Sequence, residues 1–360
     1  MIRIRFALLI ALLSVVSGCD RTERSVDYHL FAFGTLVELT FFDVSERRAQ
    51  EAVQSVDEMY QRQHKDWHAW KQGKLMDLNQ AIAEGRTITT DKAIIELIEL
   101  GRHYEDLSRG LFNPAIGNLL KMWGFQQDDR PAGPPPSAQA VSRWLASSPS
   151  MRDVQVDGLQ ASSSNPDVRL DFGGFAKGFS VERAVQLLVK LGFRNFIVNA
   201  GGDLCARGRH GERPWRIGIR HPVQEGVLAS IELDGPACVF TSGGYERLFE
   251  YQGKRYHHIL DPRTGYPAAH TRSVTVVASD ATLADAAATA LFVAGPENWR
   301  EIAVAMGVDS VLLLDEQNRA YLTPALAEQL QFEESPGAVK IVPLQESSGI
   351  ERPTNPASSP

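Results

Sequence analysis

Helical and strand-like patterns occur in mixed order along this chain, and that order limits the folds open to it. Ser45 can cap a helix that runs to about residue 64, and Asp91 can cap another that runs to about residue 108. One β-rich segment lies at 35–42. Further short β-rich segments lie later in the chain, at 196–199, 215–220, 230–233, 239–241, 273–278 and 311–314. This mixture predicts an α+β domain, which we place at residues 31–344, rather than a regular βαβ array.

The first residues have the features of a secretion signal. Two arginines precede an apolar run at 6–16, which is too short to span a bilayer and has the length of a signal-peptide core. The run ends in Val16-Ser17-Gly18-Cys19, which resembles the bacterial lipobox, where the thiol of the Cys receives a diacylglycerol. We therefore expect a lipoprotein signal peptide at 1–18 and a lipidated tether at 19–30. An ordinary signal cleaved nearby, with Cys19 as an unpaired thiol, is the alternative.

The residues after the lipobox bear on location. Asp20 resembles the inner-membrane retention signal of enteric lipoproteins. After the signal, no apolar stretch is long enough to span a bilayer, so membrane attachment would depend on the lipid. We expect the chain to be held on the periplasmic face of the bacterial inner membrane.

The charge balance argues against a nucleic-acid partner. The formal net charge is -7, and removal of residues 1–18, which contain two Arg and no acidic residue, leaves 35 basic against 44 acidic residues, or -9. A net acidic chain without a basic, aromatic-rich stripe is not typical of nucleic-acid binding.

Two further features concern the folded chain and its end. Cys205 and Cys238 could form one bridge in an oxidising compartment, although nothing in the sequence requires it. Residues 345–360 are rich in Ser, Pro, Glu and Asn, which predicts a disordered tail.

Pairs of glycines recur beside charged or aromatic residues, at 173–174, 201–202 and 243–244. They do not have the spacing of a P-loop or of a dinucleotide-binding GxGxxG turn. Adjacent glycines permit positive φ and a close approach of the backbone to a phosphate or a flavin. For any one pair a plain turn is the better explanation, but three pairs beside Asp or Tyr favour a binding cleft.

Asp285 and Thr289 are four residues apart on a helix that Ser279-Asp280 can start and Gly295-Pro296 can end. This spacing puts the carboxylate and the hydroxyl on one face of the helix, where they can offer hard oxygen ligands to Mg²⁺. The alternative is a buried Asp that hydrogen-bonds Thr inside an Ala-rich packed helix.

Two histidines, His257 and His258, precede a Pro-Arg-Thr-Gly turn at 262–265. A neutral imidazole can accept the proton of an attacking hydroxyl. Arg263 can either hold a phosphate or order the turn. One histidine of the pair can equally be a solvated strand residue.

Taken together, seven segments between about residues 30 and 295 resemble, in order, the signature segments of the ApbE family. They are Gly34-Thr35, Phe112-Asn113-Pro114 followed by Trp123-Gly124-Phe125, Asp171 to Gly178, Asn199 to Asp203, Thr241 to Arg247, His258 to Gly265 and Ala284 to Thr289. The resemblance implies a T-fold-like structure of mixed sheets with packed helices, and an FAD cleft between two subdomains.

The resemblance also implies roles for individual residues. Mg²⁺ would be held by Asp285, Thr289 and the backbone carbonyl of Gly174, and His258 would be the base. The family often has Met where Phe33 stands and Asp where Asn113 stands, and the segment around Trp70 matches only a variant of its pattern. The implied flavin contacts are Phe33, Trp70, Phe112, Asn113, Pro114, Asp171, Lys177 and Ile259.

The activity implied by the resemblance is transfer of the FMN moiety of FAD to a Thr or Ser hydroxyl, with release of AMP. The expected acceptors are subunits of membrane redox complexes. Two alternatives remain open from the sequence: an FAD pyrophosphatase, which gives free FMN and AMP, and a flavin-binding lipoprotein without catalysis. The sequence also leaves open Mg²⁺ against Mn²⁺, one ion against two, and the oligomeric state.

Overall fold

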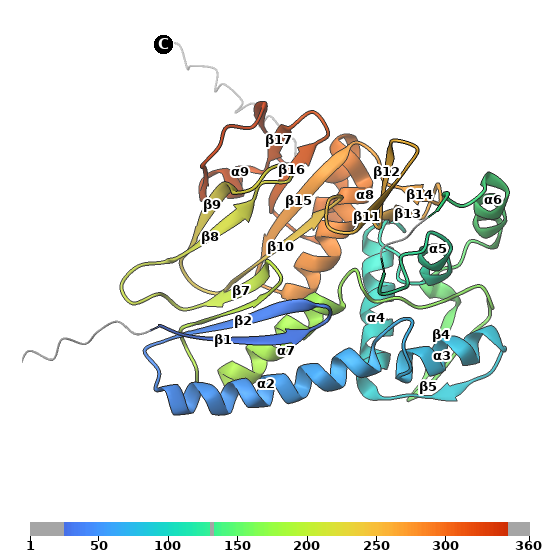
Figure 1. Ribbon diagram of the computed structural model, residues 1–360, viewed down its shortest axis with the longest axis horizontal. Helices are drawn as coiled ribbons and strands as arrows, with labels where there is room; N and C mark the ends of the chain where they lie inside the picture. The colour runs from blue at the N-terminus through green and yellow to red at the C-terminus, as the bar shows by residue number, and fades with distance from the viewer. Residues whose placement is uncertain (1–24, 130–132, 345–360) are drawn as a thin grey trace, which may run out of the picture.

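A nine-stranded sheet runs through the molecule and is covered on both faces (Figure 1). The computed structural model describes residues 25–129 and 133–344. Neighbouring strands are antiparallel except for the last pair, which is parallel. In spatial order the strands are β1 (Ser25–Ala32), β2 (Thr35–Phe42), β6 (Phe196–Ala200), β7 (Asp203–Arg207), β10 (Ala237–Gly243), β15 (Thr271–Ala278), β16 (Ser310–Asp315), β17 (Arg319–Leu322) and β19 (Ala338–Ile341). The α+β prediction is confirmed.

Alternate side chains of the central strands enter two different cores. In β10, Cys238 and Phe240 belong to one core and Val239 belongs to the other, as expected from the two-residue period of a strand. The first core contains the packed faces of α2 (Glu46–Asp66), α4 (Lys92–Leu107), α7 (Ala176–Lys190) and α8 (Ala281–Met306). The second lies under a small sheet of β18 (Leu330–Phe332), β9 (Val227–Leu233) and β8 (Trp215–Arg220).

A smaller core lies beside the large sheet. It joins the segment around Trp123 to two hairpins, and the Trp123 indole donates from Nε1 to the carbonyl oxygen of Gly265 at 2.9 Å. The elements around it are α5 (Gly117–Met122), α6 (Ala138–Ser147), β11 (Leu248–Tyr251), β12 (Lys254–His257), β13 (Leu260–Asp261) and β14 (Tyr266–Pro267). The remaining elements are α3 (Lys74–Ala83), β3 (Ile88–Thr89), η1 (Met151–Asp153), β4 (Val154–Asp157), β5 (Gln160–Ser163) and α9 (Pro324–Ala327).

The first strand begins earlier than the sequence suggests. Residues 25–30, which we expected to belong to the tether, form most of β1, and the strand pairs with β2 from Ser25 opposite Phe42 to Ala32 opposite Thr35. The tether prediction is therefore wrong for residues 25–30, because their alternating exposed and half-buried side chains allow the segment to join the sheet edge. The signal peptide at 1–18, the remaining tether at 19–24 and the tail at 345–360 lie outside the described residues.

Helix ends follow the predicted caps only in part. The Asp91 carboxylate accepts a hydrogen bond from the Ile94 amide at 2.9 Å, whereas the Ser45 side chain makes no capping hydrogen bond. Helix α8 does not stop at Gly295-Pro296: Gly295 leaves the helical region at φ 75°, and a second helical stretch continues to Met306. A proline can occupy the first position of a new helix, so this pair produces a kink instead of an end.

A disulfide joins Cys205 and Cys238, which are paired residues on β7 and β10. Both side chains are fully buried within the larger core. The sequence left this bridge open, because only the register of the two strands brings the thiols together. The bridge ties β7 to β10 a few residues from the ends of both strands.

Removal of the bridge is expected to lower the free energy of unfolding. The cysteines are 33 residues apart. Closing a loop of that size lowers the conformational entropy of the unfolded chain, which stabilises the folded state by about 3–4 kcal/mol. Equilibrium urea unfolding of the Cys205→Ala/Cys238→Ala variant should show this loss. The wild type unfolded with a reductant is the control and should approach the variant; equal stability of oxidised wild type and variant would contradict the expectation.

Candidate active site

The glycine pairs meet at one end of the large sheet. Gly201 and Gly202 form the turn between β6 and β7 with φ values of +68° and +101°, and the Gly201 amide donates to the carbonyl oxygen of Leu36 at 3.0 Å. A Cβ atom on Gly201 would lie 2.3 Å from the hydroxyl of Thr35. The turn therefore needs glycine both for its conformation and for its close contact with the β1–β2 turn.

The three predicted metal ligands come together at the start of α8. The Thr289 hydroxyl lies 3.5 Å from the carbonyl oxygen of Gly174 and 3.2 Å from the hydroxyl of Ser242. One helical turn earlier, Oδ2 of Asp285 accepts a hydrogen bond from the Gly178 amide at 2.8 Å. Among the described residues, Asp285 and Thr289 each bond to other groups and not to one another, so the simple Asp–Thr pair is not the arrangement found.

A lysine between two carboxylates sets the charge of this region. Lys177 forms an ion pair with the buried Asp203, and Oδ1 of Asp203 also accepts from the Thr241 amide at 2.7 Å. Burial opposes the charged form of Lys177, but the carboxylates of Asp203 and Asp285 raise its pKa above the usual value. Burial raises the pKa of Asp285 to about 7, although Lys177 opposes the rise.

These groups fit a divalent cation such as Mg²⁺. Asp285, Thr289 and the Gly174 carbonyl offer only hard oxygen atoms, which Mg²⁺ prefers. Burial and the negative charge of Asp203 raise the pKa of Asp285, and a cation beside this carboxylate would favour its ionised form. In the part of the chain that the structure describes, three or more His, Cys, Asp or Glu side chains nowhere gather as a metal cluster. A cation here would therefore depend on the hydroxyl and the carbonyl as well as the carboxylate.

Phe33 lies at the tip of the β1–β2 turn, at the same end of the sheet. Its backbone has φ 54°, an uncommon value for a residue with a side chain. The Phe33 amide donates to Nδ1 of His64 at 3.2 Å, and its ring packs edge-on against Tyr60 with ring centres 5.3 Å apart. The end of α2 thus fixes the position of this ring.

Trp70 belongs to an adjoining group of aromatic and charged side chains. The His68 ring packs against it with centres 4.3 Å apart, and the guanidinium of Arg247 lies 5.7 Å from the centre of the indole. Nε1 of Trp70 faces Oδ1 of Asp128 at 3.3 Å. Arg247 also donates to the carbonyl oxygens of Phe125 and Gln127 at 2.9 and 3.2 Å, so one side chain connects the loops at 66–71 and 125–128 to β11.

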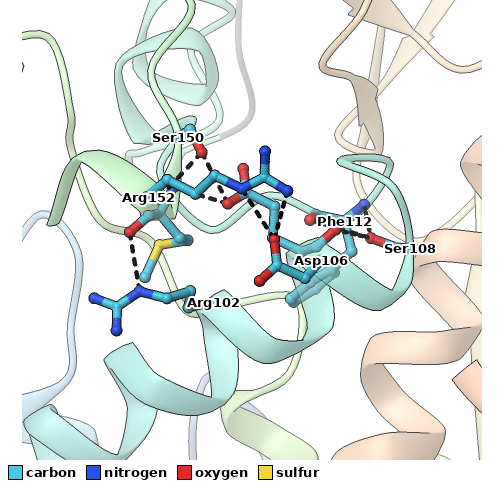
Figure 2. A network of polar contacts seen from close by, with 8 residues as sticks. Arg102, Asp106, Ser108, Phe112, Ser150 and Arg152 are labelled. Carbon is cyan, nitrogen blue, oxygen red and sulfur yellow. Dashed lines mark hydrogen bonds and ion pairs between the residues drawn. The ribbon is translucent and has the colours of Figure 1, made fainter.

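The Phe112-Asn113-Pro114 segment is held in place by hydrogen bonds and ring packing. The Phe112 amide donates to the Ser108 hydroxyl at 3.0 Å, and the buried Phe112 ring packs edge-on against Phe175. Asn113 donates to the carbonyl oxygen of Pro149 at 2.9 Å and accepts from the Ala115 amide at 2.8 Å. Figure 2 shows Ser108 beside Phe112, and the neighbouring pair of Arg152 and Asp106, whose atoms are 2.7 Å apart.

Asp171 connects this segment to the loop at 125–128. Its amide donates to the carbonyl oxygen of Pro114 at 2.9 Å, and its Oδ2 accepts from Gln126 at 2.7 Å. Its Oδ1 accepts from the Gly173 amide at 2.9 Å, which positions the backbone that leads to Gly174. Ile259 is buried, and its carbonyl oxygen accepts from the Ala268 amide.

His258 is oriented by the backbone of Arg247. The carbonyl oxygen of Arg247 lies 3.2 Å from Nδ1 of His258 and also accepts from the His258 amide at 3.0 Å. Because a carbonyl only accepts, Nδ1 must carry the proton and Nε2 keeps its lone pair. Burial, with the nearby charges of His257 and Arg247, lowers the pKa of His258 to about 3, and Lys177 acts in the same direction.

The neighbouring groups of this segment have structural contacts. Nε2 of His257 lies 3.0 Å from the carbonyl oxygen of Ala268, and its ring packs edge-on against Phe292. Arg263 forms an ion pair with Asp261 at 2.8 Å inside the turn. Of the two roles open to Arg263 from the sequence, the structure shows that it orders the turn.

Comparison with known proteins identifies the family of this arrangement. The sequence profile of the ApbE family matches residues 33–312. The chain belongs to the ApbE family. The resemblance seen in the seven segments is thereby confirmed, and the α+β fold agrees with the crystal structure of an ApbE protein from Thermotoga maritima, at a TM-score of 0.78 and 30% identity, covering 87% of this chain and 100% of that chain.

Two curated relatives carry the name FAD:protein FMN transferase. One, from Rhodobacter capsulatus, is 39% identical over 89% of this chain, which spans 61% of that relative's length. The other, from Treponema pallidum (strain Nichols), is 34% identical over 81% of this chain and 86% of its own length. The chain is thus a member of the ApbE family, and its relatives include proteins named as transferases. The roles of its individual site residues remain predictions.

Sequence reasoning gave no role to Asp203, Arg247 or Gln126. Asp203 and Arg247 belong to two of the seven family segments, but the sequence did not indicate which groups they contact. Gln126 follows the Trp123-Gly124-Phe125 segment directly. Its contact with Asp171 joins residues 45 positions apart, which no local pattern indicates.

Substitution of Gly178 is expected to disturb the carboxylate of Asp285. A Cβ atom on Gly178 would lie 2.4 Å from the carbonyl oxygen of Ala281 and 2.7 Å from Cβ of Asp285. Gly178→Ala should therefore separate α7 from α8 and destabilise the fold by about 1–3 kcal/mol. Chemical denaturation measures the loss, and Gln186→Ala on the exposed side of α7 is the control, with a change within about 0.5 kcal/mol.

The raised pKa of Asp285 predicts a pH dependence of the metal-free protein. The folded carboxyl binds its proton more tightly than the unfolded one, so its contribution to stability falls as pH rises from about 4 to about 7. Thermal unfolding with a chelator should show that Asp285→Asn gains stability relative to wild type as pH rises through this range. A difference between the two proteins that does not change with pH would contradict the expectation.

Proposed function

We propose that this ApbE chain transfers the FMN moiety of FAD to a Thr or Ser hydroxyl of a partner redox protein, with Mg²⁺ as the assisting ion. The observation that carries the proposal is the combination of an all-oxygen ligand set around Asp285 with a histidine whose Nε2 is free to accept a proton. The charge of Lys177 acts on both Asp285 and His258. Proton acceptor and ligand set therefore belong to one site.

His258 is the base in this proposal. Its Nδ1 proton faces the Arg247 carbonyl, and Nε2 accepts the proton of the acceptor hydroxyl. The hydroxyl oxygen forms a bond to the phosphorus on the FMN side of FAD, and the bond from that phosphorus to AMP breaks. The products are the phosphoester-linked FMN protein and AMP. Such a base contributes about 10²- to 10⁴-fold in rate.

Asp285, Thr289 and the Gly174 carbonyl would hold the magnesium ion. When bound, the ion neutralises negative charge on the diphosphate, and such neutralisation is a main source of rate in phosphoryl transfer. Lys177 remains paired with Asp203, which keeps one positive charge fixed beside the ligand carboxylate.

The aromatic and polar groups at the cleft would bind the flavin dinucleotide. Phe33 and Trp70 offer ring faces for stacking; Phe33 is held by Tyr60 of α2, and Trp70 by His68 in the loop that follows α2. The other proposed contacts are Phe112, Asn113, Pro114, Asp171, Lys177 and Ile259. The hydrogen bonds of Asn113 and Asp171 to the backbone fix the surface on which the dinucleotide would lie.

The proposed location is the periplasmic face of the inner membrane, with a lipid on Cys19. Cys19 and Asp20 lie outside the described residues, so this proposal is supported by the sequence of the lipobox. None of the helices in residues 25–129 and 133–344 has the length and hydropathy of a membrane-spanning segment. Acceptor subunits of membrane redox complexes would share this surface with the enzyme.

Loss of the base should abolish most of the transfer without removing the dinucleotide. His258→Ala is expected to lower the rate of FMN transfer about 10²- to 10⁴-fold, because the acceptor hydroxyl would lose the imidazole that takes its proton. The test incubates enzyme, FAD, Mg²⁺ and a candidate acceptor, and measures the acceptor mass. His29→Ala, a surface histidine on β1, is the control. An unchanged rate for His258→Ala would contradict the role of His258.

The same assay decides the reaction itself. An FMN-sized increase in the acceptor mass together with AMP supports transfer. Release of soluble FMN and AMP without an adduct identifies a pyrophosphatase instead. A bound dinucleotide that is never cleaved in the presence of Mg²⁺ identifies a binding protein without catalysis.

A further inference from the structure

The strands nearest the chain start have two functionally different ends. Ser25 pairs with Phe42, and Phe196 pairs with both Phe41 and Arg207, so the start of β1, the end of β2, the start of β6 and the end of β7 lie together. We name this the tether end. The opposite end of the same strands carries the turns of Phe33 and of Gly201-Gly202. In Figure 1 the described chain starts at the left, beside the first turn of α2.

Two adjoining grooves occupy the tether end. They have volumes of about 440 and 330 Å³, and both are lined by Phe193 and Arg194. The larger groove also contains Val189 and Arg207, and the smaller one contains Arg48 and the acidic Asp43. Neither groove contains a residue of the proposed active site, so the substrates of that site do not explain them.

Basic and apolar side chains are mixed around these grooves. Lys190 and Arg194 are exposed, and no described acidic residue forms an ion pair with either. Nε of Arg207 is buried and has no hydrogen-bond partner among the described residues. Beside them Val189 and Leu191 are 53% and 42% exposed. Lys190, Arg194 and Arg207 thus have no acidic partner among the described residues, although the chain as a whole has a net charge of -7.

One exposed basic side chain is held in place at this surface. Arg48 donates to the carbonyl oxygen of Leu191 at 2.8 Å, and its guanidinium lies 4.6 Å from the centre of the Phe193 ring. Arg209, close by, is already paired with Asp234 at 2.5 Å and contributes no free charge. The free positive charge therefore gathers at Lys190, Arg194 and Arg207, around the exposed Val189 and Leu191.

We propose that the tether end lies against the anionic head groups of the bilayer that carries the lipid anchor. This inference rests on the lipidation of Cys19 in the proposed function. Only residues 20–24 separate Cys19 from Ser25, so the strand starts within about 20 Å of the lipid. Phosphate groups would pair with Lys190 and Arg194, while Val189 and Leu191 would enter the interface. A lipid combined with a basic patch anchors more firmly than a single lipid signal.

This orientation determines the height of the active site above the membrane surface. Strand β1 has 8 residues and α2 has 21, which correspond to about 26 and 31 Å. The proposed active site, near the far end of both elements, would lie at about this height above the membrane surface. The acceptor hydroxyl would then be reached on a domain that projects from the membrane, not within the head-group layer.

The test measures the distance of single labels from the bilayer. Full-length, processed and lipidated protein is placed on vesicles of phosphatidylcholine with or without phosphatidylglycerol. A fluorophore on Gln186→Cys reports the tether end and one on Leu36→Cys reports the opposite end, and head-group spin-labelled lipid is the quencher. The introduced thiol is the free one, since Cys205 and Cys238 are bridged and Cys19 carries the lipid. We expect quenching several-fold stronger at position 186 than at 36, on phosphatidylglycerol vesicles.

Charge reversal supplies the matched control. Lys190→Glu/Arg194→Glu should reduce quenching at 186 to the level on pure phosphatidylcholine, since each basic residue strengthens binding to an anionic surface about fivefold. Lys121→Glu/Lys340→Glu, two exposed lysines of α5 and β19, gives the same net charge and should leave quenching unchanged. Equal quenching at 186 and 36 would overturn the proposal, as would equal effects of the two charge reversals.

The remaining outcomes separate this proposal from the proposed function. Mass spectrometry of the amino-terminal peptide must show the lipid on Cys19, and its absence overturns the orientation but not the transfer of FMN. In detergent solution the Lys190→Glu/Arg194→Glu variant should transfer FMN at the wild-type rate. A loss of transfer there would show that these residues support the active site and would overturn their assignment to the membrane.

Discussion

The buried carboxylate of Asp285 is the group around which the site is built. It faces the backbone of α7 through the Gly178 amide, and the charge of Lys177 acts on it, but burial still raises its pKa to about 7. A carboxylate in this condition favours a nearby cation. Three features position or surround this one group. They are the glycine at 178, the ion pair of Lys177 with Asp203 and the kinked helix α8. In the proposed function, the position of Asp285 also sets where the diphosphate of FAD would bind.

The large sheet separates two tasks along its strands. At one end lie the tight glycine turns, the Phe33 turn and the residues of the proposed active site, and the bridge between Cys205 and Cys238 ties two strands that lead to this end. At the other end, unpaired basic side chains meet exposed apolar ones beside the start of β1. A stiff antiparallel sheet can hold these two surfaces at a fixed separation. An enzyme that works on membrane-bound acceptors would benefit from such a spacer.

Local sequence patterns predicted the elements well but not their partners. Asp91 accepts the capping hydrogen bond expected of it, and Asp285 and Thr289 share a helical face as their spacing requires. Gly295-Pro296 was misread as a helix end, because the same two residues can also join two helical stretches. Residues 25–30 were misread as tether, because a short strand at a sheet edge depends on its neighbour β2 more than on its own composition.

The amino-acid sequence by itself determined the α+β class and the seven family segments, and it supplied the lipobox-like pattern behind the proposed lipid anchor, since each depends on residue types at short spacing. Only the tertiary structure decided that Gly174 faces Thr289, that Arg247 orients His258 and that the two cysteines are bridged. These contacts join residues 115, 11 and 33 positions apart. The protonation of Asp285 and His258 was likewise decided there, because a pKa follows from burial and from neighbouring charges, which exist only once the chain has folded.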